Sequence, residues 1–303
     1  MDISIVIVNW NTRELLLDCL ASVYATLKDL SFEVFLVDNA SSDGSVEAVR
    51  AHYPQVRVIR NERNLGFAAA NNMALRVMQG KYALLLNTDA VLTEGAVKRL
   101  VAFMGENQQV GMACGQLLNA DGSKQNSIAN FPTLLNLLVN ETLLRILMPK
   151  RFPSKRRDYA APIQVESCIG ACLMVRKAAL DMVGLLDERY FFFMEETDWA
   201  LSMHQAGWQS WFVPDAHIYH LQGKSAGDNV EARKMFYRSR YQYFRKWHGD
   251  LVYLFGLMVL VRLLVNVVLN SAGVLLTLGA DQGCRRRLRR YAILFGWHFR
   301  GCS

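Results

Sequence analysis

Residues 82–90 read YALLLNTDA, and this stretch decides the fold class of the chain. An uninterrupted apolar run of this length is typical of a short strand that is buried on both faces, as in a parallel sheet covered by helices. The run ends on Asn87 and Asp89. A carboxylate at the tip of a buried strand indicates a ligand site at that edge of the sheet.

The same pattern, an apolar β-branched run followed by a polar break and an amphipathic helix, occurs four times from residue 3 onward. The expected strands are 3–8 (ISIVIV), 32–37 (FEVFLV), 56–60 (VRVIR) and 82–86 (YALLL). The expected helices lie near 12–27, 43–52, 67–79 and 93–105. Such alternation requires crossover connections, so it predicts an α/β fold with a Rossmann-like, mostly parallel central sheet flanked by helices.

Each of these strands ends in polar residues. They are Asn9 and Asn11, then Asp38, Asn39 and Ser41, then Arg60, Asn61 and Asn64, and finally Asn87 and Asp89. Because ligands bind beyond the carboxyl ends of parallel strands, we expect these side chains to converge. The simpler alternative is that they are ordinary loop residues, with Thr12 and either Ser42 or Asp43 capping helices.

The composition of the chain does not identify its binding partner. The chain has 303 residues, 34 Lys and Arg against 27 Asp and Glu, and a formal charge of +7, which suits a phosphate-bearing partner. Its six cysteines are scattered and do not form a zinc pattern, so we expect reduced thiols in a cytosolic compartment. The N-terminal MDISIVIVNW alternates like a strand and is not a signal peptide, so the catalytic part should stay in the cytoplasm.

The second half breaks the alternation. Residues 133–149 predict an amphipathic helix, 165–175 (VESCIGACLMV) a strand antiparallel to the others, and 228–248 a basic, aromatic-rich helix. We therefore divide the chain into a domain of residues 1–225 and a helical, basic region of residues 226–303. Within the first domain, 1–118 form the nucleotide-binding half and 119–225 the acceptor-side half.

The C-terminal tail predicts membrane association. Residues 251–280 carry a single charge, Arg262, and are followed by the cluster RRRLRR at 285–290. Arg262, Asn266 and Asn270 share one helical face, which favours a helix in the membrane interface, or a hairpin dipping into one leaflet, over a plain span. The arginine cluster suits anionic lipid on the cytoplasmic side. A buried helix of a bundle or dimer is the alternative.

Three groups of residues could support chemistry. Asn87 and Asp89 can supply oxygen ligands to a divalent cation whose other ligands are phosphates. Glu195, Glu196 and Asp198 place three acids beside the aromatic YFFF, which is how a general base gains strength, although acids in a first helical turn also complement its dipole. In HIYHLQGKS, His220 is a better metal-ligand candidate than His217, and Lys224 could contact a phosphate.

Several classes are disfavoured because their motifs are missing from the sequence. There is no P-loop, the first strand-to-helix turn NWNTRE lacks the glycines of a dinucleotide site, and no Gly-x-Ser-x-Gly elbow occurs. NAD-dependent and serine-hydrolase functions therefore lose their support.

The order of motifs over residues 3–250 resembles the inverting GT-A glycosyltransferases of family 2. The matching segments are IVIVNWN, VDNASSDGS, RNLGFAAANN, LLLNTDA, DGSKQNSIANFP, IGACLMVRKAAL, LLDERYFFFMEETDWAL and AGW. The nearest likeness is to a bacterial branch that makes lipid-linked polysaccharide from dTDP-rhamnose. The resemblance implies a nucleotide-diphosphate sugar donor, a lipid-linked or cell-surface glycan acceptor, Mg²⁺ or Mn²⁺, and no nucleic acid. It also implies the cytoplasmic face of the bacterial inner membrane.

The resemblance also implies roles for individual residues. Asp38 would contact the nucleobase, Asp89 and His220 would bind the metal, and Glu196 would be the catalytic base with Asp198 beside it. The remaining implied substrate-binding residues are Asn9, Asn11, Asn64, Gly66, Asn72, Asn87, Gly170, Ala171 and Lys224. One departure is Ser202, where relatives commonly carry arginine.

Two other functions stay open at this point. A nucleotidyltransferase that makes nucleotide-sugars could use the same sheet, although it usually has a glycine-rich loop after the first strand. A non-catalytic membrane adaptor with a degenerate transferase domain is the other, and the acids at 38, 89, 196 and 198 argue against it. Neither the sugar nor the acceptor is determined by a motif.

Overall fold

The computed structural model describes residues 1–139, 141–149, 151–154, 157–221 and 230–301. It divides into two compact units, one of Met1–Phe131 with Arg145–Ala226 and the other of Pro132–Leu144 with Gly227–Ser303. The boundary that we placed between 225 and 226 lies outside the described residues. Residues 132–144, which we placed in the acceptor-side half, group with the C-terminal helices.

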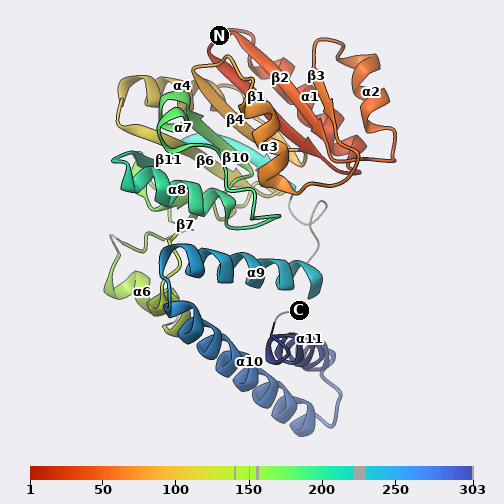
Figure 1. Cartoon of the computed structure of the whole chain (residues 1–303), viewed down its shortest axis with the longest axis vertical. Coiled ribbons are helices and arrows are strands. Elements are labelled where there is room, and N and C mark those ends of the chain that lie inside the picture. Colours follow the sequence, from red (N-terminus) through yellow and green to blue (C-terminus); the bar gives the residue numbers. More distant parts are fainter. Residues whose placement is uncertain (140, 150, 155–156, 222–229, 302–303) are drawn as a thin grey trace. The chain divides into compact units, whose positions relative to one another are not determined.

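The first unit is built on a central sheet that, among the described residues, has nine strands (Figure 1). Its order is β3-β2-β1-β4-β10-β6-β11-β5, with β8 paired to β11. The strands are β1 Ile3–Asn9, β2 Phe32–Asp38, β3 Arg57–Arg60, β4 Tyr82–Asn87, β5 Ala90–Leu92, β6 Val110–Leu118, β8 Ile163–Val165, β10 Cys172–Arg176 and β11 Gln209–His220. A separate two-stranded sheet pairs β7 Ile128–Ala129 with β9 Ser167–Cys168.

The strand directions explain where a ligand can bind. β3, β2, β1 and β4 are parallel, which confirms the predicted parallel arrangement of the first four strands. β10 is antiparallel to both β4 and β6, and β11 is parallel to β6. The carboxyl ends of β1, β2, β4, β6 and β11 therefore meet at one edge, together with the start of β10. The predicted strand at 165–175 is antiparallel as expected, but it is interrupted between β9 and β10.

Two layers of helices enclose the sheet because alternate strand residues point to opposite faces. The helices of this unit are α1 Arg13–Thr26, α2 Ser45–His52, α3 Phe67–Leu75, α4 Ala96–Glu106, α7 Lys177–Val183 and α8 Glu195–Gln205. Ile5 and Leu84 pack with α1 and α4 in one buried cluster. Val6 and Leu85 pack with α3, α7 and α8 in the other. Both faces are thus covered, as the uninterrupted apolar strands require.

The second unit contains the short helix α5 Leu134–Leu138 and three long helices, α9 Val230–Trp247, α10 Leu251–Leu276 and α11 Gln282–Phe299. The helix expected over 133–149 is instead two short helices, α5 and α6 Glu141–Leu147. The Thr133 and Asn136 side chains form a capping box at the start of α5. The polar face of α10 is satisfied within the unit, because Arg262 donates to the Leu137 carbonyl and Asn270 accepts from Arg287.

α10 is, by length and composition, the one helix of the described residues that could cross a membrane. It has 26 residues and a mean hydropathy of 2.4 over its most apolar window, of which 17% is buried. Its outward side chains include large apolar residues such as Leu257 and Leu269, which are 58% and 64% exposed. So much exposed apolar surface is typical of a face that contacts lipid or another protein.

Candidate active site

The first part of the site joins the ends of β1 and β2. Asn9 is fully buried and donates to both the Asp38 carboxylate and the Ser41 hydroxyl, each at 2.9 Å. The second carboxylate oxygen of Asp38 accepts from the Ser41 backbone N–H. Asn11, at a positive φ of 54°, accepts from the Ser42 backbone N–H through its side chain. These bonds fix the two loops that follow the strands.

A pocket of about 380 Å³ opens beside Asp38. It is lined by Ala40, Ser41, Arg60, Asn61 and Glu62, all of which follow β2 or end or follow β3. Asp38 and Arg60 are paired in the parallel register, and Asn61 donates its backbone N–H to the Asp38 carbonyl. The size and mixed polarity of this pocket suit a planar, hydrogen-bonding group such as a nucleobase.

A chain of hydrogen bonds leads from this pocket to the tip of β4. The Thr12 hydroxyl contacts the Asn9 side-chain oxygen at 2.8 Å and the Thr88 hydroxyl at 2.9 Å. Thr12 does not cap α1 with its side chain, so the capping alternative fails for this residue. Thr88 directly precedes Asp89, which is only 1% exposed. Asp38 and Asp89 are thereby parts of one connected edge.

Asp89 faces His220, which ends β11. Asp89 Oδ1 lies 3.3 Å from His220 Nε2, and His220 Nδ1 lies 2.9 Å from Gln125 Oε1. The Gln125 amide nitrogen donates to the carbonyl of His220 and to Asn119, so its oxygen must accept from the imidazole Nδ1–H. In the neutral ring, the Nε2 lone pair then points at a carboxylate oxygen. Two such electron-rich atoms side by side are suited to sharing a cation.

This donor set fits a divalent cation. A buried carboxylate oxygen and an imidazole nitrogen fixed by a second hydrogen bond are a common pair of metal ligands. Among the described residues, no group of three or more His, Cys, Asp or Glu forms a full protein cage. Enzymes that act on phosphate esters usually hold Mg²⁺ with only one or two protein side chains. Oxygen atoms of the substrate and water molecules complete the coordination of the ion.

Glu196 lies next to the start of β10. The backbone N–H groups of Gly170 and Thr197 hydrogen-bond its carboxylate, whereas Oε2 is buried without a hydrogen bond in the described part of the chain. Burial, which outweighs these bonds, raises the pKa of Glu196 to about 7. A Cβ on Gly170 would lie 3.9 Å from the Glu196 side chain, so the two residues are in contact. A carboxylate with a pKa near neutrality is suited to general-base catalysis.

Glu196 is connected to Asp89 and His220 through the sheet. The Asn87 backbone N–H donates to the Ala171 carbonyl at 2.9 Å, which joins the end of β4 to the segment 169–171. That segment interrupts the predicted strand and carries Gly170 beneath Glu196. The predicted residues Asp38, Asp89, Gly170 and Glu196 therefore lie along one continuous edge.

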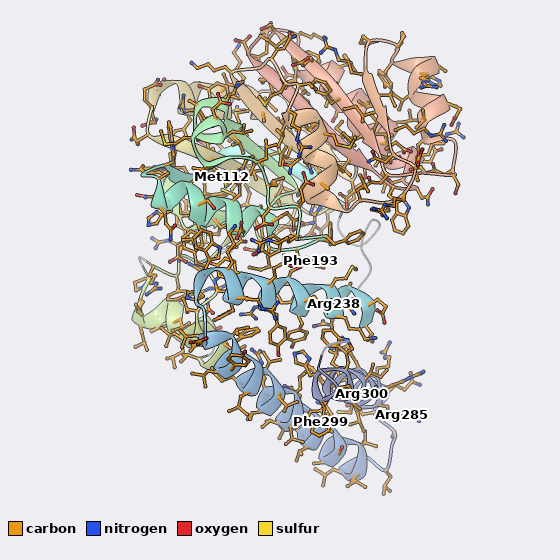
Figure 2. The ribbon with its side chains drawn as sticks, in the orientation of Figure 1. Met112, Phe193, Arg238, Arg285, Phe299 and Arg300 are labelled. Carbon is orange, nitrogen blue, oxygen red and sulfur yellow. The ribbon has the colours of Figure 1, made fainter. Side chains whose placement is uncertain are left out.

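A strained turn positions α8. Phe193 and Met194 have positive φ values of 70° and 73°, and Phe193 lies in the turn that leads into the helix (Figure 2). Two consecutive non-glycine residues in this region are uncommon and usually mark a functional site. The Tyr190 hydroxyl, in the loop before this turn, donates to Asp198 of α8 at 3.1 Å and so ties the loop to the helix. Asp198 is 2% exposed, so it faces the protein and not solvent.

α3 supports the same turn from the other side. Asn72 donates to the Leu186 carbonyl and to Glu188, and its oxygen accepts from the Leu186 backbone N–H. Phe67 donates its backbone N–H to the Phe191 carbonyl at 2.7 Å. Asn72 and the N-terminus of α3 thus hold the 186–191 loop in place.

Gly66→Ala should destabilise the protein by roughly 2–4 kcal/mol, because two costs add. Gly66 has a φ of 83°, and a Cβ there would lie 2.3 Å from the Phe191 carbonyl oxygen. Chemical denaturation measures the loss. Gly122→Ala is the matched control, since Gly122 has a φ of 80° but open space around it, and it should cost clearly less. Equal losses would show that the contact with Phe191 does not matter.

Some predicted residues lie elsewhere. Asn64 accepts from the backbone N–H of Gly66 and shapes the local turn. His217 is exposed, while Lys224 lies outside the described residues. The sequence reasoning missed Gln125, Thr88 and Tyr190. No local signal marks these three, because each acts on a partner that is distant in the chain or in another element.

Comparison with known proteins adds to this geometry. Residues 4–184, more than half of the chain, match the family model described as glycosyl transferase family 2. This chain is a member of that family. The predicted enzyme class, glycosyltransferase, is therefore confirmed, and the family assignment gives no support to a nucleotidyltransferase.

A curated relative and two solved structures are similar to this family 2 chain. The relative, 28% identical over 232 residues, is the N-acetylglucosaminyl-diphospho-decaprenol L-rhamnosyltransferase of Mycobacterium tuberculosis; the match covers 71% of this chain and 75% of the relative. PcManGT of Pyrobaculum calidifontis, solved with GDP-Man and Mn²⁺, has a TM-score of 0.60 at 18% identity, covering 97% and 87% of the two chains. S. aureus TarS, solved with UDP, has a TM-score of 0.52 at 17% identity, covering 83% and 69%. These likenesses confirm the GT-A fold.

Proposed function

We propose that this enzyme is a metal-dependent, inverting glycosyltransferase that uses a nucleotide-diphosphate sugar as donor. The acceptor is a hydroxyl of a lipid-linked or cell-surface glycan. The observation that carries this proposal is the continuous edge that links Asp38, the Asp89–His220 pair and Glu196. Along this edge, the pocket beside Asp38 would bind the nucleobase, Asp89 and His220 would lie at the diphosphate, and Glu196 would act as the general base.

The reaction follows from the roles of these residues. Glu196 accepts the proton of the acceptor hydroxyl while that oxygen forms a bond to the anomeric carbon. The bond from that carbon to the diphosphate oxygen breaks, and the nucleotide leaves with the electron pair. The displacement inverts the configuration in one step, so no covalent nucleophile on the protein is required.

Asp89 and His220 are the residues that would hold Mg²⁺ or Mn²⁺. The bound cation would neutralise the charge that develops on the leaving diphosphate. Gln125 fixes the His220 ring in the tautomer that offers Nε2 to the metal. Asn87, at the same strand tip, would contribute to the donor side of the cleft together with Asn9 and Asn11.

L-rhamnose from dTDP-rhamnose is the donor that we favour. The support is the resemblance to the mycobacterial enzyme, whose name specifies L-rhamnose and a diphospho-decaprenol acceptor. In this chain the pocket beside Asp38 would receive the nucleobase. Gly170 and Ala171 would line the sugar side, since Gly170 contacts Glu196.

The second unit would place the enzyme on the cytoplasmic face of the bacterial inner membrane. α10 exposes apolar side chains along its length. Arg285, labelled in Figure 2, begins the basic cluster of α11 and is exposed. Apolar surface next to arginines is the combination that binds a bilayer with anionic lipid.

A donor panel tests the proposal. Thermal shift with dTDP-rhamnose, UDP-GlcNAc, UDP-galactose and GDP-mannose should give the largest rise in Tm for dTDP-rhamnose, and only when Mg²⁺ or Mn²⁺ is present. A ligand at about 100 times its Kd stabilises a protein by roughly 2.7 kcal/mol, which is readily detected. A panel in which no donor raises Tm with metal, and in which none is hydrolysed, would remove the donor assignment.

A further inference from the structure

The second unit contains a cavity of about 630 Å³ between α9, α10 and α11. Its volume lies in the range of small-ligand sites. Every lining residue belongs to this unit, and none of these described lining residues is acidic. None of the residues that carry the proposed transfer reaction is among those that line it.

One wall of the cavity is cationic and polar. Arg238, Tyr241, Gln242 and Arg245 line it from α9, at the spacing i, i+3, i+4 and i+7 that places side chains on one helical face. The Arg238 guanidinium lies 5.5 Å from the centre of the Trp297 ring, which orients it, and Figure 2 shows Arg238 on α9. Neither arginine has an acidic partner in the described part of the chain.

His298 of α11 adds a buried polar group to the cavity. It is 8% exposed, and its ring makes only a poorly aligned hydrogen-bonding contact with the Leu294 backbone among the described residues. The rings of Tyr237 and Tyr241 pack against it at 4.8 and 5.5 Å between centroids. Burial lowers the pKa of His298, so at neutral pH the ring is neutral and offers one N–H donor. A ligand that accepts a well-aligned hydrogen bond from this buried ring would replace the weak backbone contact.

The opposite wall is apolar. Val252, Gly256, Leu257 and Leu260 of α10 line it, and the missing side chain of Gly256 leaves room beside the Tyr241 hydroxyl. From Leu257 the apolar surface continues along α10 through Val261, Leu264 and Val268, which are 52%, 46% and 57% exposed. These residues follow the spacing i, i+4, i+7 and i+11 of one helical stripe.

We propose that this cavity binds the diphosphate headgroup of a membrane lipid, with the lipid chain lying along the stripe on α10. Two guanidinium groups without acidic partners and one N–H donor match a diphosphate, which carries more charge than the single phosphate of a bulk phospholipid. The apolar stripe on α10 continues from the cationic wall, so a ligand with a hydrocarbon chain would gain contacts there that a free anion cannot make. The inference rests on the proposed function in one respect: a lipid-linked acceptor would be held here by its diphosphate.

Calorimetric titration with farnesyl diphosphate, in the presence of a chelator, tests the inference. The chelator keeps diphosphate from binding through metal at Asp89, so the result is independent of the donor site. The full-length protein should bind this probe, and binding should be unchanged in Asp89→Ala. Arg238→Gln and Arg245→Gln should each weaken binding roughly tenfold or more, as expected for a lost charge-assisted bond.

Arg285→Gln is the matched control, because it removes the same charge from an exposed position outside the cavity. It should leave farnesyl diphosphate affinity unchanged. Arg245 is exposed, so its variant should fold, which circular dichroism verifies.

Three outcomes would overturn the inference. Equal losses in Arg245→Gln and Arg285→Gln would indicate a diffuse basic surface. Inorganic diphosphate binding as tightly as farnesyl diphosphate would exclude a lipid site. If Arg245→Gln weakens binding to phosphatidylglycerol vesicles but not to farnesyl diphosphate, the cavity binds bulk phospholipid and not a lipid diphosphate. Loss of donor binding in the panel above would instead refute the proposed function and leave this result standing.

Discussion

Glu196→Gln should lower the rate of sugar transfer by about 10²–10⁴-fold while the affinity for donor stays nearly constant. The amide is almost the same size as the carboxylate, so the fold and the contact with Gly170 should persist. It cannot accept a proton at neutral pH, so the acceptor hydroxyl keeps its proton as it attacks. Single-turnover transfer and donor binding by calorimetry measure the two effects separately.

The chain offers a matched control for this change one residue away. Glu195 begins α8, is 4% exposed and also has a buried carboxylate oxygen that lacks a hydrogen bond in the described part of the chain. Glu195→Gln should keep most of the turnover, because the side-chain atoms nearest to Gly170 belong to Glu196. If Glu195→Gln abolished transfer and Glu196→Gln did not, the base would be misassigned.

The pH profile of the wild-type enzyme gives a second check on Glu196. Burial raises the pKa of Glu196 to about 7, and only the ionised form can accept a proton. As pH falls below about 7 the protonated fraction grows, so kcat/KM should fall about tenfold per pH unit. Above that value it should level off. The residual activity of Glu196→Gln should not show this transition.

Asp89→Ala should reduce transfer by at least about 10³-fold, since a bound cation contributes several kcal/mol of charge stabilisation at a phosphoryl leaving group. The variant should also lose the increase in donor affinity that Mg²⁺ or Mn²⁺ gives to the wild type. Titration of dTDP-rhamnose with and without metal measures this difference directly.

The stability of Asp89→Ala must be measured beside its activity. Asp89 is buried, but its carboxylate is close to His220, whose ring Gln125 still holds after the substitution. We therefore expect little loss of fold by circular dichroism. Asp181→Ala, on the exposed surface of α7, removes an acid far from the strand tips and should change neither quantity. Donor affinity that stays the same after both Asp89 and metal are removed would contradict the scheme.

The sequence by itself was sufficient for the first half of the fold. Continuous apolar runs at 3–8, 32–37 and 82–86 correspond to β1, β2 and β4. A strand that is buried on both faces needs apolar residues at consecutive positions, so the sequence alone identifies it. The polar residues after those runs lie at one edge, since parallel strands with crossover helices leave no other arrangement. Family membership followed from the order of the motifs and is confirmed by the family model.

Sequence patterns failed where residues distant in the chain meet. Gln125 and His220 are 95 positions apart, and nothing near either residue predicts their hydrogen bond. The segment 133–149 carries the period of one helix, yet the structure has α5 and α6 there, and residues 132–144 group with the C-terminal helices. Local periodicity reports which face is apolar but not which partner covers it.

The amino-acid sequence therefore determined the strands, the polar strand ends and the family, because these depend on the chemistry of neighbouring residues. The tertiary structure decided which backbone groups surround each acid of α8. By position alone, Glu195, Glu196 and Asp198 are equivalent acids of one first helical turn, and the family resemblance is what favoured Glu196 as the base. The strained turn at Phe193 and Met194 leads into this helix, and the strand order brings Gly170 into contact with Glu196. Our proposal that Glu196 is the base rests on that contact, which depends on residues distant in the chain.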